Sequence, residues 1–166
     1  MKKLRLILGD QLNSQHSWFR ETDSNVIYCI FEMRQETDYV THHIQKVTGF
    51  FAAMRNFAKE LKIANHAVIY FNINDKKNTQ SLVENLTILI EENNIEKFEY
   101  LSPDEYRLDQ QIKIFCKNLP IDSRVFSSEH FYTEREDLET FFKGKKQFLM
   151  ENFYRNMRKK HQILMI

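Results

Sequence analysis

The sequence predicts an α/β protein: a Rossmann-like, doubly wound parallel sheet of five strands in the order 3-2-1-4-5, with a C-terminal helical extension. Short apolar runs alternate with longer amphipathic segments, the pattern of strands joined by right-handed crossover helices. The apolar runs are nearly continuous in Val, Ile, Leu, Phe and Tyr, as in strands covered on both faces. Only three Gly and two Pro occur, which argues against long linkers and disorder.

The strands and helices follow from these runs and from their periodicity. Apolar residues at spacings of three and four define a core-facing stripe in the first long helix, made of Ile44, Val47, Phe51, Met54, Ala58 and Leu61 and widened by Phe50 and Phe57. The segment 13–24 is expected to be a loop or a short helix. Strands are expected at 4–8, 26–33, 67–73, 97–101 and 124–127, and helices near 40–62, 79–92 and 102–117.

Two capping boxes predict where later helices begin. Ser102, followed by Pro103 and by Glu105 three residues on, is typical of a helix N-terminus in which Ser and Glu satisfy exposed amides reciprocally. Thr133 and Glu136 repeat this spacing and predict a short helix to Phe142, closed by Gly144 at the C′ position. A final helix is expected to carry Phe148, Leu149, Phe153, Tyr154 and Met157.

Charge separates the end of the chain from the rest. The net charge is +1, yet residues 143–166 hold seven Lys or Arg against one acid, Glu151, which is +6 and leaves −5 elsewhere. We therefore expect an α/β domain over 1–132 and a basic, aromatic, helical extension over 133–166. The extension is either an interaction surface or a solvated helix face. If it binds a partner, docking of a domain is favoured over nucleic acid by the apolar ending 162–166.

Several functional classes are excluded or disfavoured. The sequence lacks a Gly-x-Gly-x-x-Gly dinucleotide loop, a phosphate-binding P-loop, a Gly-x-Ser-x-Gly elbow and Cys/His zinc spacing. His42 and His43 point about 100° apart on a helix and cannot ligate one ion by themselves. Cys29 and Cys116 are expected to be buried thiols, with no metal role. No stretch is long enough for a membrane span and no signal peptide is evident, so a cytoplasmic protein is expected.

A ligand site is expected where the first two strands end. Asp10 and Gln11 follow Gly9 after the first strand, and open α/β sheets bind ligands beyond the carboxyl ends of their strands. The second strand leads into a polar segment that holds Glu32, Glu36, Asp38, Tyr39, His42 and His43. Carboxylates and an amide would read the edge of a planar heterocycle, with Phe50 and Tyr39 as an apolar wall. Alternatively, Asp10 and Asp38 only cap turns, and His16 and Trp18 serve either binding or packing.

Five segments in register resemble one known family. Together they are similar to the N-terminal domain of the deoxyribodipyrimidine photolyase-related proteins, which include iron–sulfur bacterial cryptochromes and prokaryotic (6-4) photolyases. The resemblance covers nearly the whole chain. The segments are Leu6-Ile7-Leu8-Gly9-Asp10-Gln11-Leu12, Tyr39-Val40-Thr41-His42-His43-Ile44-Gln45-Lys46, Ala53-Met54-Arg55-Asn56-Phe57-Ala58-Lys59-Glu60-Leu61, Pro103-Asp104-Glu105-Tyr106-Arg107 and Met150-Glu151-Asn152-Phe153-Tyr154-Arg155-Asn156-Met157-Arg158.

The resemblance implies an antenna domain that binds 6,7-dimethyl-8-ribityllumazine and passes excitation energy to FAD. The FAD, an iron–sulfur cluster and the DNA-lesion site are expected only in a helical domain that this sequence lacks, so no autonomous DNA repair is expected from this part. The partner would be that FAD-binding helical domain, docked through Phe153, Tyr154, Arg155 and Arg158. By motif, the pigment site would involve Gly9, Asp10, Gln11, Glu36, Tyr39, His43 and Phe50.

Two hypotheses from different classes remain. The first is the pigment-binding antenna of a light-dependent DNA-repair enzyme or photoreceptor. The second is a pigment-free interaction or scaffold domain that docks a partner through residues 143–166. Catalysis by the chain alone is disfavoured, because no nucleophile–base set is recognisable.

Overall fold

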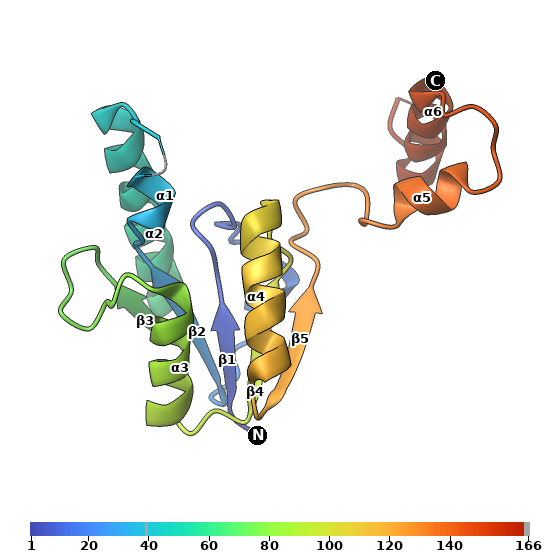
Figure 1. Cartoon of the computed structure of the whole chain (residues 1–166). Coiled ribbons are helices and arrows are strands. Elements are labelled where there is room, and N and C mark those ends of the chain that lie inside the picture. The colour runs from blue at the N-terminus through green and yellow to red at the C-terminus, as the bar shows by residue number, and fades with distance from the viewer. Residues whose placement is uncertain (39, 165–166) are drawn as a thin grey trace. The chain divides into compact units, whose positions relative to one another are not determined.

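The computed structural model describes residues 1–38 and 40–164, with residue 36 described by its backbone only (Figure 1). The chain divides into two compact units, Met1–Ser128 and Glu129–Ile166. The larger unit holds the whole sheet, and the smaller unit is helical.

The larger unit is built on a five-stranded parallel sheet in the order β3-β2-β1-β4-β5, which confirms the predicted fold class and strand order. The chain leaves the strands earlier than the apolar runs suggested, so the predicted ends at residues 8, 33 and 73 are too late. Ladder-type bonding still continues one residue further, from Ile7 N to Cys29 O and from Glu32 N to Phe71 O. The strands are β1 (Lys3–Leu6), β2 (Val26–Phe31), β3 (Ala67–Phe71), β4 (Lys97–Leu101) and β5 (Asp122–Phe126).

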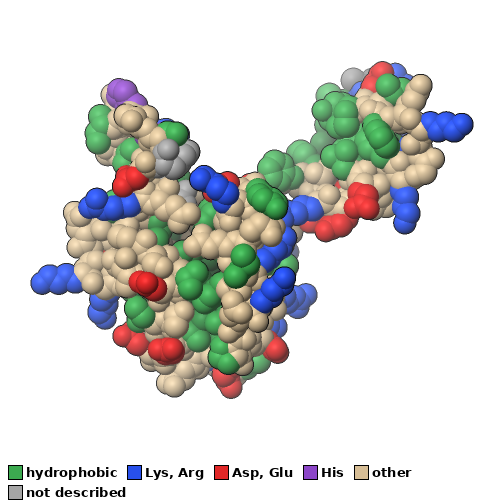
Figure 2. Space-filling view, in the orientation of Figure 1, with side chains coloured by type: hydrophobic (Ala, Val, Ile, Leu, Met, Phe, Trp, Pro, Cys, Tyr) green, Lys and Arg blue, Asp and Glu red, His purple; other side chains and the backbone are tan. Residues whose placement is uncertain are grey.

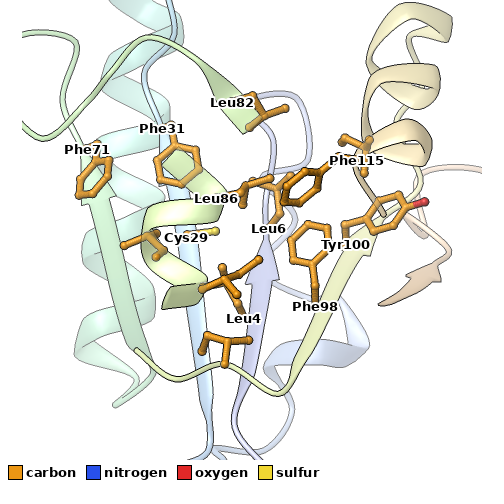
Figure 3. Packing of buried hydrophobic residues seen from close by; sticks show 14 of the residues in the cluster. Leu4, Leu6, Cys29, Phe31, Phe71, Leu82, Leu86, Phe98, Tyr100 and Phe115 are labelled. Atoms are coloured by element: carbon orange, nitrogen blue, oxygen red, sulfur yellow. The ribbon is translucent and has the colours of Figure 1, made fainter. Parts of the chain in front are cut away.

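Helices cover both faces of the sheet. The predicted loop contains a single 3-10 turn, Ser17–Phe19, which packs on the same face as α2 through Trp18. On the other face, α3 and α4 bury their apolar side chains against β1, β2 and β4, as Figures 1 and 3 show. The helices of this unit are α1 (Gln35–Asp38), α2 (Ile44–Ile63), α3 (Leu82–Glu92) and α4 (Tyr106–Asn118).

The predicted core stripe of α2 is correct only in its later turns. Phe51, Met54 and Ala58 are buried, whereas Ile44 is 71% exposed and Val47 is only partly buried. The first turns of α2 extend beyond the carboxyl end of the sheet (Figure 1), so they have no strand beneath them to cover. Periodicity identified the face of the helix but not how far along it the sheet reaches.

The capping box predicted at Ser102 does not form. α4 begins four residues later, at Tyr106, and Glu105 is its N-cap without a side-chain capping bond. Ser102 is instead held in extended backbone, because its N–H donates to Phe126 O at 2.8 Å and thereby continues the β4–β5 ladder. Because the Ser102 N–H is bonded to Phe126, it is not available for the return bond from Glu105 that a capping box requires.

The smaller unit contains α5 (Asp137–Phe142) and α6 (Met150–His161). The capping box predicted at Thr133 is also wrong. Glu136 is the N-cap of α5 and makes no capping bond, while the Asp137 carboxylate accepts from Glu134 N at 3.1 Å. Gly144 has a φ of +77°, which fits the helix stop expected there. Phe148 and Leu149 precede α6 and do not belong to it.

Candidate functional site

The loop after β1 is held by the side chain of Gln11. Its Oε1 accepts from Leu8 N at 3.1 Å, while its Nε2 donates to Leu101 O at 3.4 Å and to Ser102 O at 3.2 Å. Only 1% of Gln11 is exposed. The amide therefore ties the end of β1 to the end of β4, and its part in the site is to fix the position of this loop.

Gly9 leaves room for the side chains of Phe50 and Met54, which approach the loop from α2. A Cβ atom at this position would lie 2.9 Å from Phe50 Cε1 and 3.0 Å from Met54 Sδ. Side chains do not tolerate such distances without displacement. The edge of the Phe50 ring thus lies against the loop backbone.

A cavity of about 400 Å³ opens beside this loop. Its apolar wall comes from Phe50 and two leucines, and its polar groups are the Asp10 carboxylate, the Gln35 amide and the Glu105–Arg107 ion pair. Such a mixture of an aromatic wall and a few polar groups suits a planar heterocycle with hydrogen-bonding edges. The lining residues are Leu8, Gly9, Asp10, Gln35, Phe50, Glu105, Arg107 and Leu108.

Of the remaining predicted pigment residues, His43 does not line the cavity. His43 is exposed and is the N-cap of α2, where its Nδ1 accepts from Gln45 N at 3.2 Å. His42 lies beside Lys46, with 3.2 Å between Nδ1 and Nζ. Glu36 belongs to α1, and its side chain lies outside the described part of the chain, as does the whole of Tyr39.

Glu32, a candidate for the ligand site, faces away from the cavity and organises the end of β2. Its carboxylate receives Arg55 Nε at 2.6 Å, Arg55 NH2 at 2.9 Å, Tyr70 OH at 2.6 Å and Ile73 N at 2.8 Å. Burial raises the pKa of Glu32, but these hydrogen bonds outweigh it and leave the pKa below its usual value. The bond to Glu32 in turn raises the pKa of Arg55.

A network of buried amides, not anticipated from the sequence, fixes the loop between β3 and α3. Asn78 Nδ2 donates to Glu32 O at 2.8 Å and to Asn72 O at 3.0 Å, and Asn85 Nδ2 donates to Asn78 Oδ1 at 2.9 Å. Gln80 accepts from Arg34 N at 2.8 Å. The network sets the exit of β2 directly before Gln35, so it positions one wall of the cavity.

Sequence reasoning also missed Gln35, Glu105 and Arg107 as cavity residues. Glu105 and Arg107 follow β4, which neighbours β1, so the same strand-end rule that selected Asp10 could have selected them. Gln35 offered no signal beyond its place in the polar segment after β2.

The smaller unit has an aromatic interior, and the predicted docking residues divide between it and the surface. Phe153 is only 4% exposed and packs on Phe141 and Phe142, with ring centroids 5.3 and 6.1 Å apart. Tyr154 is 60% exposed. Arg155 pairs with Glu151 at 2.6 Å, and Arg158 donates to the carbonyls of Ile163 and Leu164.

The described part of the chain offers neither a cluster of metal-binding side chains nor a helix that could cross a membrane. Across residues 1–38 and 40–164, no group of three or more His, Cys, Asp or Glu side chains is placed to hold a metal ion. In the same part of the chain, no helix combines the length and apolar character needed to span a bilayer. Cys29 is a free thiol, and its burial raises its pKa.

Comparison with known proteins gives two findings. A family model described as deoxyribodipyrimidine photo-lyase-related protein matches residues 5–166. A (6-4) photolyase from Agrobacterium fabrum (strain C58 / ATCC 33970) is 31% identical over 168 residues. The match takes in 99% of this chain but 33% of the Agrobacterium protein, so the chain spans about a third of the length of that relative.

Proposed function

Because the chain belongs to the deoxyribodipyrimidine photo-lyase-related protein family, we propose that its unit Met1–Ser128 is a pigment-binding antenna domain. The pigment is 6,7-dimethyl-8-ribityllumazine, which when bound would absorb near-ultraviolet light and transfer the energy to a flavin. The flavin, the iron–sulfur cluster and DNA-lesion binding are assigned to a helical domain outside this sequence.

The observation that carries this proposal is the cavity at the carboxyl end of β1. Its volume of about 400 Å³ is within the range of about 300–1,000 Å³ found for small-molecule sites. Phe50 supplies a ring for contact with a flat heterocycle, and Asp10 and Gln35 supply an acceptor and an amide for its edge. Gly9 allows the ring of Phe50 to lie against the loop, which brings these groups around one space.

Fluorescence titration of the purified chain with this lumazine tests the proposal. We expect a saturable change with one site per chain. Asp10→Ala should weaken binding by about tenfold to a hundredfold, because a hydrogen bond to a charged group contributes about 1.5–3 kcal/mol. Glu92→Ala, at the exposed far end of α3, is the matched control and should bind as the wild type does. A titration without saturation would refute the pigment role.

The second candidate, a pigment-free scaffold, is favoured by the surface of the smaller unit. Phe148, Leu149 and Tyr154 are 70%, 54% and 60% exposed, and Figure 2 shows hydrophobic side chains gathered on this unit. Contiguous apolar surface of this kind marks interaction sites. In this function the smaller unit docks a partner domain. The contact surface would consist of these three exposed residues, and not of Phe153, which was predicted for docking but is buried.

The lumazine titration separates the two candidates, because a pigment-free scaffold shows no saturable change, and binding of a defined partner then tests the docking surface. The probe is the part of the Agrobacterium (6-4) photolyase that lies beyond the third matched by this chain. A scaffold should bind it with the wild-type surface and lose binding with Phe148→Ser/Leu149→Ser, whether or not lumazine is present. The Glu139→Ser variant, also exposed in this unit, controls for general changes.

A further inference from the structure

A groove of about 730 Å³ runs between α3 and α4, on the face of the sheet opposite to α2. Val83 and Thr87 line it from α3, and Tyr106 and Ile114 line it from α4. Tyr106 is 76% exposed and Ile114 is 59% exposed, and Figure 2 shows hydrophobic side chains gathered between the two helices. Apolar surface gathered on one face in this way marks an interaction site.

The two helices beside the groove differ in charge. α3 holds three Glu and no Lys or Arg, whereas α4 holds three Lys or Arg against one acid. That acid, Asp109, is buried and accepts a hydrogen bond from Lys113 Nζ at 2.7 Å, so the accessible side of α4 is basic. The groove therefore separates an acidic helix from a basic one.

Glu91 of α3 and Lys117 of α4 lie along the groove without ion-pair partners. Glu91 follows Thr87 by four residues and Lys117 follows Ile114 by three, so each shares a helix face with a residue of the groove. Both side chains are exposed, and across residues 1–38 and 40–164 neither of them forms an ion pair. The acid and the base are thus available to another molecule.

Glu91 and Lys117 also lie level with one another along the groove. The strands β4 and β5 begin in register, with Lys97 paired to Asp122. Four residues separate the end of α3 from β4, and three separate the end of α4 from β5. Each charged residue is one position before the end of its helix, and the two helices run side by side in one direction (Figure 1).

We propose that the groove is a self-association surface, on which the same groove of a second copy of this chain docks. A symmetric dimer places one patch on itself about a two-fold axis. With the axis along the groove, α3 of each copy lies on α4 of the other, and Glu91 meets Lys117 of the second copy twice. With the axis across the groove, α3 would lie on α3, with three Glu against three Glu. Charge therefore selects the first arrangement.

The area of this surface indicates how strongly two copies should associate. The 11 residues of α3 and the 13 of α4 extend over about 16 and 20 Å, and packed helices lie about 8–10 Å apart, so the pair presents roughly 500 Å². Two copies would bury roughly 1,000 Å² in total, near the lower limit for a specific interface. We therefore expect a reversible dimer with a Kd on the order of 10–100 μM.

Sedimentation velocity of the purified chain between about 5 and 300 μM tests the proposal. We expect the mass to rise from that of one copy towards that of two across this range. Ile114→Glu places a charge in the apolar groove and should weaken self-association by at least about tenfold. Ile63→Glu, the same change at an exposed position of α2 on the opposite face, is the matched control and should dimerise as the wild type does.

Two results of this experiment would overturn the proposal. One is a wild type that stays monomeric, and the other is a folded Ile114→Glu variant that dimerises as the wild type does. A different occupant would be the part of the Agrobacterium (6-4) photolyase beyond the third matched by this chain. If that part binds the monomeric wild type and not Ile114→Glu, the groove belongs to that domain and the second copy is excluded.

A charge exchange tests which helices meet. Glu91→Lys and Lys117→Glu should each weaken self-association by about tenfold, because each dimer then contains two like-charged contacts. An equimolar mixture of the two variants, with a dye on one of them, should regain wild-type dimerisation, since every facing pair in the mixed dimer has opposite charge. A mixture that associates no better than the single variants would overturn the pairing of α3 with α4. If Ile114→Glu does not fold, this mixture decides the question.

Discussion

Replacing Glu32 by Gln should destabilise the larger unit by about 3 kcal/mol at pH 7. The Glu32 carboxylate is fully buried and accepts four hydrogen bonds, two of them from Arg55. Gln has nearly the same shape, so the change removes the charge and replaces one acceptor oxygen with an NH2 group. That NH2 group would face N–H and O–H donors, so the donors that now bond to this oxygen would lose their acceptor.

The size of this destabilisation follows from the different exposure of Glu32 and Arg55. Breaking a buried ion pair by removing one partner costs about 3–5 kcal/mol. The side chain of Arg55 is 54% exposed, so water can solvate its guanidinium once Glu32 is neutral, and the lower end of that range applies. Tyr70 and the Ile73 amide lose a charged acceptor as well, which prevents the cost from falling much further.

The stability lost in the Glu32→Gln variant should be larger at neutral pH than at acidic pH. The pKa of Glu32 is lowered in the folded chain, so between that pKa and the unfolded value, about 4.3, the unfolded state binds more protons. The contribution of this carboxylate to stability is therefore complete above about pH 5 and is lost as the pH falls through the folded pKa. The difference between the wild type and Glu32→Gln should shrink in that window.

Urea unfolding followed by the fluorescence of Trp18, the single tryptophan, measures this difference. Trp18 is buried in the larger unit and reports on its unfolding. Glu60→Gln, an exposed replacement of the same kind on α2, should stay within about 0.5 kcal/mol of the wild type. A loss below 1 kcal/mol for Glu32→Gln, or a loss equally large at pH 3 and pH 7, would refute this account of the network.

Three further predictions concern packing and buried amides. Gly9→Ala should cost about 1–3 kcal/mol in the free energy of unfolding, because the added Cβ meets Phe50, and Phe50→Ala should relieve most of that cost in the double variant. Asn78→Ala should cost about 1–3 kcal/mol and should speed hydrogen exchange of the loop between β3 and α3, since buried carbonyl groups lose their donor. Phe153→Ala should cost about 3–5 kcal/mol in the smaller unit, whereas Tyr154→Ala should change its stability by less than about 0.5 kcal/mol, as thermal unfolding would measure.

Each of these three predictions would be contradicted by a specific result. Additive costs in the Gly9 and Phe50 double variant would mean that the two residues do not meet. Unchanged exchange in the Asn78 variant, compared with an exposed control such as Asn118→Ala, would exclude the amide network as the support of the loop. Equal effects at positions 153 and 154 would contradict the division into an inner and an outer face of α6.

The sheet could be predicted from the sequence because its second and third strands are continuous apolar runs, whereas β5, Asp122–Phe126, is largely polar and exposed. Val26–Phe31 and Ala67–Phe71 have no competing helical period, so alternation with amphipathic segments led directly to the parallel order. The beginnings of the later helices could not be predicted in the same way. Ser102 has the residue pattern of a helix cap, but its N–H is bonded to Phe126 in the β4–β5 ladder. Whether this N–H bonds to the neighbouring strand or to Glu105 depends on tertiary pairing.

The sequence led to the region of the cavity, but not to the direction of each side chain around it. Gly9, Asp10 and Phe50 lie around one cavity because strand ends in a parallel sheet share an edge. The direction of Gln11 depends on a tight turn that brings Leu8 O within 3.0 Å of Gln11 N, and no sequence period specifies it. Glu32 was placed in the ligand site because it ends β2, yet Arg55, twenty-three residues later, draws its carboxylate to α2.

The bond made by Gln11 also determines when this site can exist during synthesis of the chain. The carbonyl groups that hold its amide belong to Leu101 and Ser102, 90 and 91 residues further along. A nascent chain that has emerged only as far as β3 contains every residue of the first loop but not the groups that fix its geometry. The loop is therefore among the first segments synthesised, but its geometry is fixed only after β4 has joined the sheet; under the proposed function, no pigment would bind before that step.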